Sequence, residues 1–144
     1  MLLNLVLAWS LLAITVVIHA AGLTLVARHT LSSSASLDPR FWSVTWLLVR
    51  VAWQLIVFHF IEITLWALFY WWHDCLPSFE SSLYFSGVTY ATVGYGDMVL
   101  PLQWRLFGPM EGLTGILMCG LSVSVFFAIF TKIFRSDGVA PSAS

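Results

Sequence analysis

The residues with the most distinctive chemistry in this 144-residue chain are Thr92–Gly96, which read TVGYG and are followed by Asp97. Gly94 and Gly96 can adopt positive φ without steric cost, so successive peptide groups can turn their carbonyl oxygens toward one axis. Neutral carbonyl oxygens can replace the water around a hard cation without trapping it, as a ring of carboxylates would. The segment therefore predicts a path for a dehydrated cation, with the Thr92 hydroxyl supplying a last ring of oxygens.

The composition restricts the environment in which such a path can exist. Apolar residues make up 60% of the chain, charged residues only 9%, and the mean hydropathy is +0.91. Soluble domains carry roughly 25% charged residues, and a chain this short has too much surface to hide so much apolar material. A soluble globular enzyme, a nucleic-acid-binding protein and a disordered chain are therefore excluded. The lipid bilayer is the solvent that fits.

Three stretches are long and apolar enough to cross a bilayer, which takes about 20 residues. They are residues 2–27, 43–72 and 106–134. Residues 78–91 are too short to cross and fit a re-entrant helix, with Ser78 as the N-cap and Glu80 in the first turn. Its negative C-terminal end would stabilise a cation below the TVGYG segment. We therefore predict an all-α membrane protein with three transmembrane helices, a re-entrant pore helix and a filter loop.

The predicted organisation is an N-terminal transmembrane helix (1–28), a cytoplasmic linker (29–41), a pore module (42–135) and a short cytoplasmic tail (136–144). Within the pore module we expect an outer helix (43–73), a pore helix (78–91), the filter (92–97) and an inner helix (104–134). The first helix is expected to pack outside the outer helix.

The basic residues predict the orientation of this arrangement. Arg28 and Arg40 flank the first linker, and Lys132 and Arg135 lie near the C-terminus, whereas Arg105 stands alone in the other loop. Because Lys and Arg gather on the cytoplasmic side, the C-terminus is expected to be cytoplasmic and the N-terminus external. The expected location is the cell membrane, plasma or inner.

Residues 42–134 resemble the pore module of the potassium channel family, in its small prokaryotic-type form with one extra N-terminal transmembrane helix. The resemblance depends on the sequence TVGYGD after a short helix and between two spans. It implies passive, potassium-selective conduction rather than an enzyme, without a cofactor or an organic substrate. The implied ion-binding residues are Thr92, Val93, Gly94, Tyr95 and Gly96, with K⁺ coordinated at the first four.

A single filter strand cannot surround an ion, so copies of the chain must assemble around a rotation axis. Potassium filters consist of four such loops, and we therefore expect a four-fold homotetramer in the lipid bilayer. The side chains of Val93 and Tyr95 are expected to point away from the axis and pack against the wall of the pore.

The resemblance also implies residues that support the filter: Tyr84, Phe85, Thr89, Asp97 and Glu111. Tyr84 and Phe85 occupy the place of an aromatic pair around the filter, and Tyr84 could donate a hydrogen bond to Asp97. Glu111, near the outer half of the inner helix, either braces the pore helix from behind or adds negative potential near the pore. We favour bracing.

Two glycines of the inner helix, Gly115 and Gly120, have two possible roles. By the resemblance, Gly115 is the first candidate and Gly120 the second for a hinge that opens the cytoplasmic end. Alternatively, both only allow close helix packing, as small residues do in membranes. Cys119 is expected to be a small core residue, and Cys75, in the external loop, is either a free thiol or paired with its copy in another subunit.

His59 and Glu62 lie three residues apart in the second span and therefore share a helix face. We expect a hydrogen-bonded pair, with Ser10 or Thr15 of the first span as a further partner. The pair either holds helices together or responds to protons.

Three other functions stay open. A poorly selective monovalent cation channel would have the same architecture, although the intact Tyr95 argues against it. A non-conducting accessory membrane subunit is the second. The third, an intramembrane metalloenzyme, would need its ligands to converge, and the spacing His59-x-x-Glu62 is not a strong metal signature. Those ligands would be His19, His59, Glu62 and Glu111.

Overall fold

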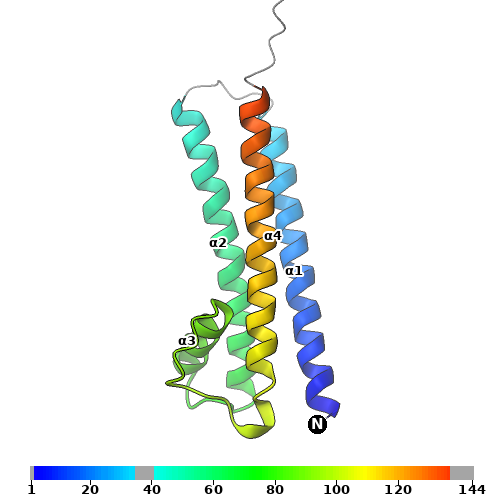
Figure 1. Cartoon of the computed structure of the whole chain (residues 1–144), viewed down its shortest axis with the longest axis vertical. Helices are drawn as coiled ribbons and strands as arrows, with labels where there is room; N and C mark the ends of the chain where they lie inside the picture. Colours follow the sequence, from blue (N-terminus) through cyan, green and yellow to red (C-terminus); the bar gives the residue numbers. More distant parts are fainter. Residues whose placement is uncertain (1, 35–40, 137–144) are drawn as a thin grey trace, which may run out of the picture.

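A computed structural model describes residues 2–34 and 41–136 of the chain. Every regular element in these ranges is helical, in the order α1 (Leu2–Ser34), α2 (Phe41–Trp72), α3 (Phe79–Tyr90), the short 3₁₀ turn η1 (Leu102–Trp104) and α4 (Phe107–Ser136). Figure 1 shows α1, α2 and α4 running side by side along the long axis, with the short α3 beside the lower half of α2. The predicted all-α membrane fold is confirmed. Apart from Ser136, the tail predicted over 136–144 lies outside the described residues.

Three helices are long and apolar enough to cross a membrane. The qualifying segments are Leu2–Thr30, Phe41–Trp72 and Leu102–Ile133. With 12 residues, α3 rises about 18 Å, which is short of the roughly 30 Å of a hydrocarbon core. The protein is therefore a multi-pass membrane protein, and α3 is too short to cross the bilayer.

The first helix is longer than its sequence suggests. α1 continues to Ser34, so residues 29–34, assigned above to the linker, are helical. The Ser-rich composition suggested a loop, but neither glycine nor proline interrupts this stretch before Pro39, and Thr30 is buried. The rest of that linker, residues 35–40, lies outside the described residues.

The expected position of the first helix, outside the outer helix, is wrong. α1 contacts both α2 and α4. Near its middle, a Cβ at Gly22 would lie 2.8 Å from the Phe58 ring, so the missing side chain lets α1 approach α2 closely. Near its N-terminus, Asn4 donates a hydrogen bond to the Gln103 carbonyl oxygen just before α4 (2.8 Å). α1 is therefore an integral member of the bundle.

One of the two cysteines differs from expectation. Cys75 is buried in an apolar cluster with Tyr70 and Phe107, and its thiol is free, which disfavours a bond to another subunit. Cys119 is an exposed residue on α4 rather than a core residue, because it lies at an open groove between α2 and α4. Burial, with a smaller contribution from Asp74, raises the pKa of the Cys75 thiol to about 11.

We expect Cys75 to resist alkylation in the folded protein. At pH 8 a thiol with this pKa is only about 0.1% thiolate, and the thiolate is the nucleophile. Iodoacetamide at pH 8 should therefore modify Cys75 of folded protein at least about tenfold more slowly than Cys75 of protein unfolded in detergent and urea. Peptide mass spectrometry measures both rates, and equal rates would contradict the burial described here.

Candidate functional site

The start of α3 is fixed by its first residues, as the sequence predicts. Ser78 is the N-cap, with extended backbone (φ −149°, ψ 162°), and its side-chain oxygen accepts the Ser81 backbone N–H at 3.1 Å. Glu80 lies in the first turn, where a carboxylate favours the positive end of the helix dipole. The cap fixes where α3 begins, and the helix then runs to Tyr90, two residues before Thr92.

The segment after α3 is joined to the helix by hydrogen bonds. The Thr92 N–H donates to the Thr89 carbonyl (2.9 Å), and the Val93 and Gly94 N–H groups both donate to the Val88 carbonyl (2.9 and 3.3 Å). The last carbonyls of a helix lack intrahelical partners, so the following segment satisfies two of them. Residues 92–94 are therefore held on the C-terminal end of α3.

The backbone of the TVGYG segment alternates in conformation. Thr92, Gly94 and Gly96 have positive φ angles of 61°, 53° and 78°. The sequence predicts this conformation for the two glycines but not for Thr92, because a β-branched residue rarely adopts it. Strained backbone of this kind costs on the order of 1–3 kcal/mol and is concentrated at functional sites. The alternation turns successive peptide groups in opposite senses along the segment.

The segment lies open on the surface of a single chain. Every residue from Thr92 to Asp97 is exposed, with Val93 at 52% and Tyr95 at 70% of full exposure. Irregular backbone at membrane depth is tolerated only where protein covers it or where it lines a watery path. The wall against which Val93 and Tyr95 are expected to pack is therefore not provided by their own chain.

The two neighbouring aromatic residues of α3 that were expected to support the filter, Tyr84 and Phe85, lie differently. The Tyr84 hydroxyl donates to Asp97 Oδ2 at 2.8 Å, which is the contact expected from the sequence. This bond raises the pKa of the Tyr84 phenol, so the hydroxyl stays protonated and donates at neutral pH. Phe85 packs edge-on against Tyr70 of α2, with ring centroids 5.4 Å apart. Tyr84 therefore holds the residue after the segment, whereas Phe85 anchors α3 to the bundle.

Glu111 of α4 links its own helix to α2 and α3. Its side chain is fully buried in α4. Oε1 accepts a hydrogen bond from the Ser86 hydroxyl of α3 (2.5 Å), and Oε2 accepts one from the Tyr70 hydroxyl of α2 (2.7 Å). This geometry favours the bracing role over the alternative of adding negative potential near the pore.

Replacing Glu111 with alanine is expected to destabilise the bundle by about 2 kcal/mol or more, because the Tyr70 hydroxyl loses its acceptor and a cavity forms. Glu111→Gln is the matched control, since an amide can still pair with both hydroxyl groups and fills the same volume. Thermal unfolding of the purified protein measures both variants. Equal stability of wild type and Glu111→Ala would contradict the bracing role.

A comparison with known families shows which family the chain belongs to. A family model described as "Ion channel" matches residues 46–132, which is more than half of the chain. The chain belongs to this ion channel family. The match includes nearly all of α2, all of α3, the TVGYG segment and most of α4, whereas α1 lies outside it.

Individual relatives of this ion channel match a shorter region. Over 61 residues the chain is 34% identical to the A-type voltage-gated potassium channel KCND3 of Rattus norvegicus, of Oryctolagus cuniculus and of Homo sapiens. The aligned region covers 42% of this chain and 9% of each relative, so the chain spans less than a tenth of the relatives it matches. No solved structure matches the chain.

The inner-helix glycines of this ion channel occupy different environments. A Cβ at Gly115 would lie 2.0 Å from the Tyr90 carbonyl oxygen, and one at Gly112 would lie 3.4 Å from the Thr89 carbonyl oxygen. A Cβ at Gly120 would meet nothing within 4 Å. The structure therefore favours the packing role for Gly115, whose missing side chain lets the end of α3 rest on α4. Gly120 stays the candidate hinge.

The predicted pair of His59 and Glu62 is part of a larger closed network. Glu62 Oε1 lies 2.7 Å from His19 Nδ1 of α1. His19 Nε2 and His59 Nε2 lie 3.2 and 3.1 Å from the Ser122 hydroxyl of α4. His59 Nδ1 lies 3.0 Å from the Tyr90 hydroxyl of α3, which in turn donates to Glu62 Oε2. We call these five residues the polar network; it contains one or more residues from each of the four α-helices.

The contacts of the polar network can all be hydrogen bonds at once. One proton on each of the five side chains is enough for the five contacts, and such a closed circuit carries no net charge. Among the described residues no buried side-chain nitrogen or oxygen lacks a partner. This arrangement suits a membrane interior, where an unpaired charge is costly.

The expected partners Ser10 and Thr15 are wrong. The Ser10 hydroxyl donates within α1 to Val6, and the Thr15 hydroxyl donates to Leu11 and accepts from the Trp66 indole N–H. The partner from α1 is instead His19, which lies further along the helix than Ser10 and Thr15 and contacts Glu62. Of the four residues that a metalloenzyme would require, His19, His59 and Glu62 converge, whereas Glu111 belongs to its own contacts with Tyr70 and Ser86.

Proposed function

We propose that the protein is a potassium-selective channel in which four copies surround one conduction path lined by Thr92–Gly96. The observation that carries this proposal is the alternating positive φ of Thr92, Gly94 and Gly96 in a segment that is exposed along its whole length. Only a neighbouring copy and a watery axis can satisfy such a surface at membrane depth.

The chemistry of conduction in this proposal needs backbone oxygens alone. Carbonyl groups from four copies replace the water around a K⁺ ion, which binds at Thr92, Val93, Gly94 and Tyr95. Because the ligands are neutral, the ion can leave as readily as it enters. Conduction is passive, follows the electrochemical gradient, and requires no cofactor or organic substrate.

The supporting contacts fit this role. Tyr84 holds Asp97 at one end of the segment, and the amide groups of Val93 and Gly94 are held on α3 at the other. Glu111 holds α3 against α2 and α4. A filter fixed at both ends keeps its carbonyl oxygens in place when an ion is absent.

We also propose that the filter faces the outside of the cell. In Figure 1 the N-terminus and the segment after α3 lie toward one end of the bundle, and the end of α4 lies at the other. Arg28 lies near the C-terminal end of α1 and Lys132 near that of α4, which both belong to the second end, so the positive-inside rule favours a cytoplasmic position for that end. The N-terminus is then external.

Reconstitution in liposomes tests the proposed function. Liposomes that contain the purified protein and are loaded with K⁺ should release K⁺ when diluted into Na⁺ medium. Recording in planar bilayers should give a reversal potential close to the K⁺ equilibrium potential. A reversal potential near zero would indicate the poorly selective alternative. Absence of flux from correctly assembled tetramers would indicate the accessory subunit instead, and cross-linking that yields only monomers would contradict the shared filter.

A further inference from the structure

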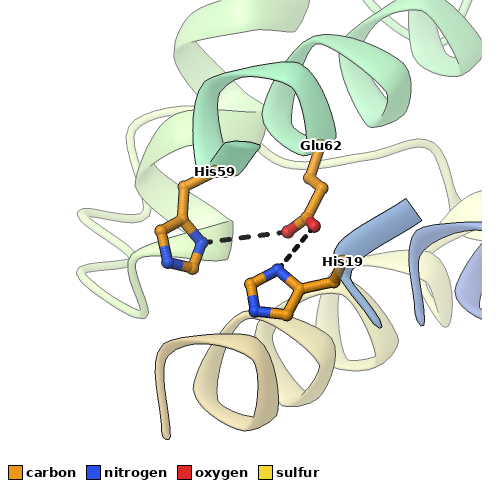
Figure 2. A group of neighbouring side chains, drawn as sticks. All are labelled: His19, His59 and Glu62. Atoms are coloured by element: carbon orange, nitrogen blue, oxygen red, sulfur yellow. Dashed lines mark hydrogen bonds and ion pairs between the residues drawn. The ribbon is translucent and has the colours of Figure 1, made fainter. Parts of the chain in front are cut away.

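Two imidazoles and a carboxylate converge inside the bundle at a place that the filter does not use. Figure 2 shows His19, His59 and Glu62 with the two His Nδ1 atoms pointing toward the two oxygens of the carboxylate. One donor atom from each of these residues lies within 4.8 Å of the others. His19 comes from α1, which lies outside the residues matched by the family model.

We propose that His19, His59 and Glu62 bind a Zn²⁺ ion. Two histidines and one carboxylate are a ligand set that zinc takes in proteins, with a fourth position left for water or another oxygen. Imidazole nitrogen and carboxylate oxygen both suit this metal.

The three donors lie near one another but must close up to bind this ion. His19 Nδ1 lies 2.7 Å from Glu62 Oε1 and His59 Nδ1 lies 3.8 Å from Glu62 Oε2, and one ligand atom from each residue lies within 4.8 Å of the others. Tetrahedral zinc with bonds of about 2.0–2.1 Å holds its ligand atoms about 3.3 Å apart. Binding therefore requires the side chains to rotate so that the widest separation shortens toward that value.

The surroundings hold the three donors in position. A metal-bound histidine usually donates its other ring N–H to a nearby oxygen, and here both Nε2 atoms lie within 3.2 Å of one oxygen, the Ser122 Oγ. A hydroxyl oxygen has two lone pairs, so it can accept both. The Tyr90 hydroxyl donates to Glu62 and so orients the carboxylate. This second layer of contacts exists before any ion binds.

The protons balance when the ion binds. The proton shared by Glu62 and His19 leaves to solvent, and the His59 proton moves from Nδ1 to Nε2, where the Ser122 oxygen accepts it. The Ser122 hydroxyl then turns its own proton to a carbonyl oxygen of the preceding turn of its helix. One proton is released per ion, and the ion with the carboxylate leaves one net positive charge. The hydroxyl of Tyr90, the last residue of α3, lies 3.0 Å from His59 Nδ1, and its oxygen is a polar neighbour of this charge.

One side of the site opens to a groove between α2 and α4. This open groove of about 330 Å³ is lined by His59 and Ser122 and otherwise by mostly apolar residues. The His59 side chain is 19% exposed, whereas those of His19 and Glu62 are buried. In this proposal an ion that enters by the groove meets His59 first. The proposal does not depend on the proposed potassium selectivity, because it concerns only these three side chains and their supports.

Zinc titration of the tag-free, detergent-purified full chain tests the proposal. Isothermal calorimetry should give one Zn²⁺ per chain, with micromolar or tighter affinity. His59→Gln should weaken binding by about 100-fold or more, and Ser122→Ala by about tenfold. The matched control is His73→Gln, since His73 is exposed in the loop after α2 and should leave the affinity unchanged.

Two further readouts keep the test independent of how the variants fold. Saturating Zn²⁺ should raise the unfolding temperature of the wild-type protein by on the order of 5 °C, because the ion binds only the folded bundle. X-ray absorption of the zinc-loaded wild type should show two imidazoles and no sulfur. No binding to the wild type, unchanged affinity in His59→Gln, loss of binding in His73→Gln, or a sulfur ligand such as Cys119 would each overturn the proposal.

Discussion

Replacing Gly96 with alanine is expected to reduce potassium flux through reconstituted protein to the level of empty liposomes. Gly96 has a φ of +78°, where an alanine Cβ meets the following carbonyl oxygen at a cost of about 1–2 kcal/mol in each copy. The strain is relieved when the peptide group turns, which moves its carbonyl oxygen off the axis. In the proposed tetramer all four copies carry the change, so the whole carbonyl ring at this level is affected. Potassium release from liposomes measures the loss.

A second glycine provides the matched control for this experiment. Gly108 lies in the first turn of α4, and a Cβ there would meet only the Phe85 ring, at an ordinary 3.9 Å. Gly108→Ala should therefore assemble and conduct like the wild type. Wild-type flux and selectivity in Gly96→Ala would contradict the proposed filter, whereas loss of tetramers in that variant would call for the same measurement on Gly94→Ala, at φ +53°.

Replacing Gly115 with alanine is expected to prevent stable folding. The added Cβ would lie 2.0 Å from the Tyr90 carbonyl oxygen and 2.9 Å from its carbonyl carbon. These are backbone atoms at the end of α3, so α3 or α4 must shift as a whole rather than one side chain. Overpacking costs about 1–3 kcal/mol where side chains can adjust, and we expect at least the upper value here. Thermal unfolding and size-exclusion chromatography measure the loss of folded protein.

Gly120→Ala is the companion variant, because it separates packing from bending in the same helix. A Cβ at Gly120 meets nothing within 4 Å, so the unfolding temperature should match that of the wild type. If α4 bends at Gly120 when the pore opens, this variant changes flux without changing stability. A Gly115→Ala protein as stable as Gly120→Ala would contradict the close contact between α3 and α4.

The features that were predicted correctly depend on neighbours in the sequence. A run of apolar residues predicts a span, Ser78 and Glu80 predict the start of α3, and glycine predicts the positive φ at positions 94 and 96. Each of these features depends only on residues a few positions away. The contact between Tyr84 and Asp97 was also predicted, but only because the family resemblance places both beside the filter.

The features that were missed depend on residues far apart in the sequence. Glu62 meets His19 across 43 positions, and His19 meets Ser122 across 103. An apolar span gives no sign of which of its faces meets which neighbour, so a histidine in the first helix could not be assigned to a carboxylate in the second. The burial of Cys75 and the exposure of Cys119 follow from the same packing. The positive φ of Thr92 has no local signal, since only the surrounding fold imposes it.

The hydrogen bonds that His19 makes to Glu62 and Ser122 affect how this pore region can be transplanted into another protein. A chimera that carries only the region from α2 to α4 would lack His19, so Glu62 would keep the Tyr90 hydroxyl and Ser122 would keep His59 as partners. A buried polar group that loses a hydrogen-bond partner costs about 1–3 kcal/mol. A transplanted segment that includes the leading helix is therefore expected to be more stable than one cut at α2.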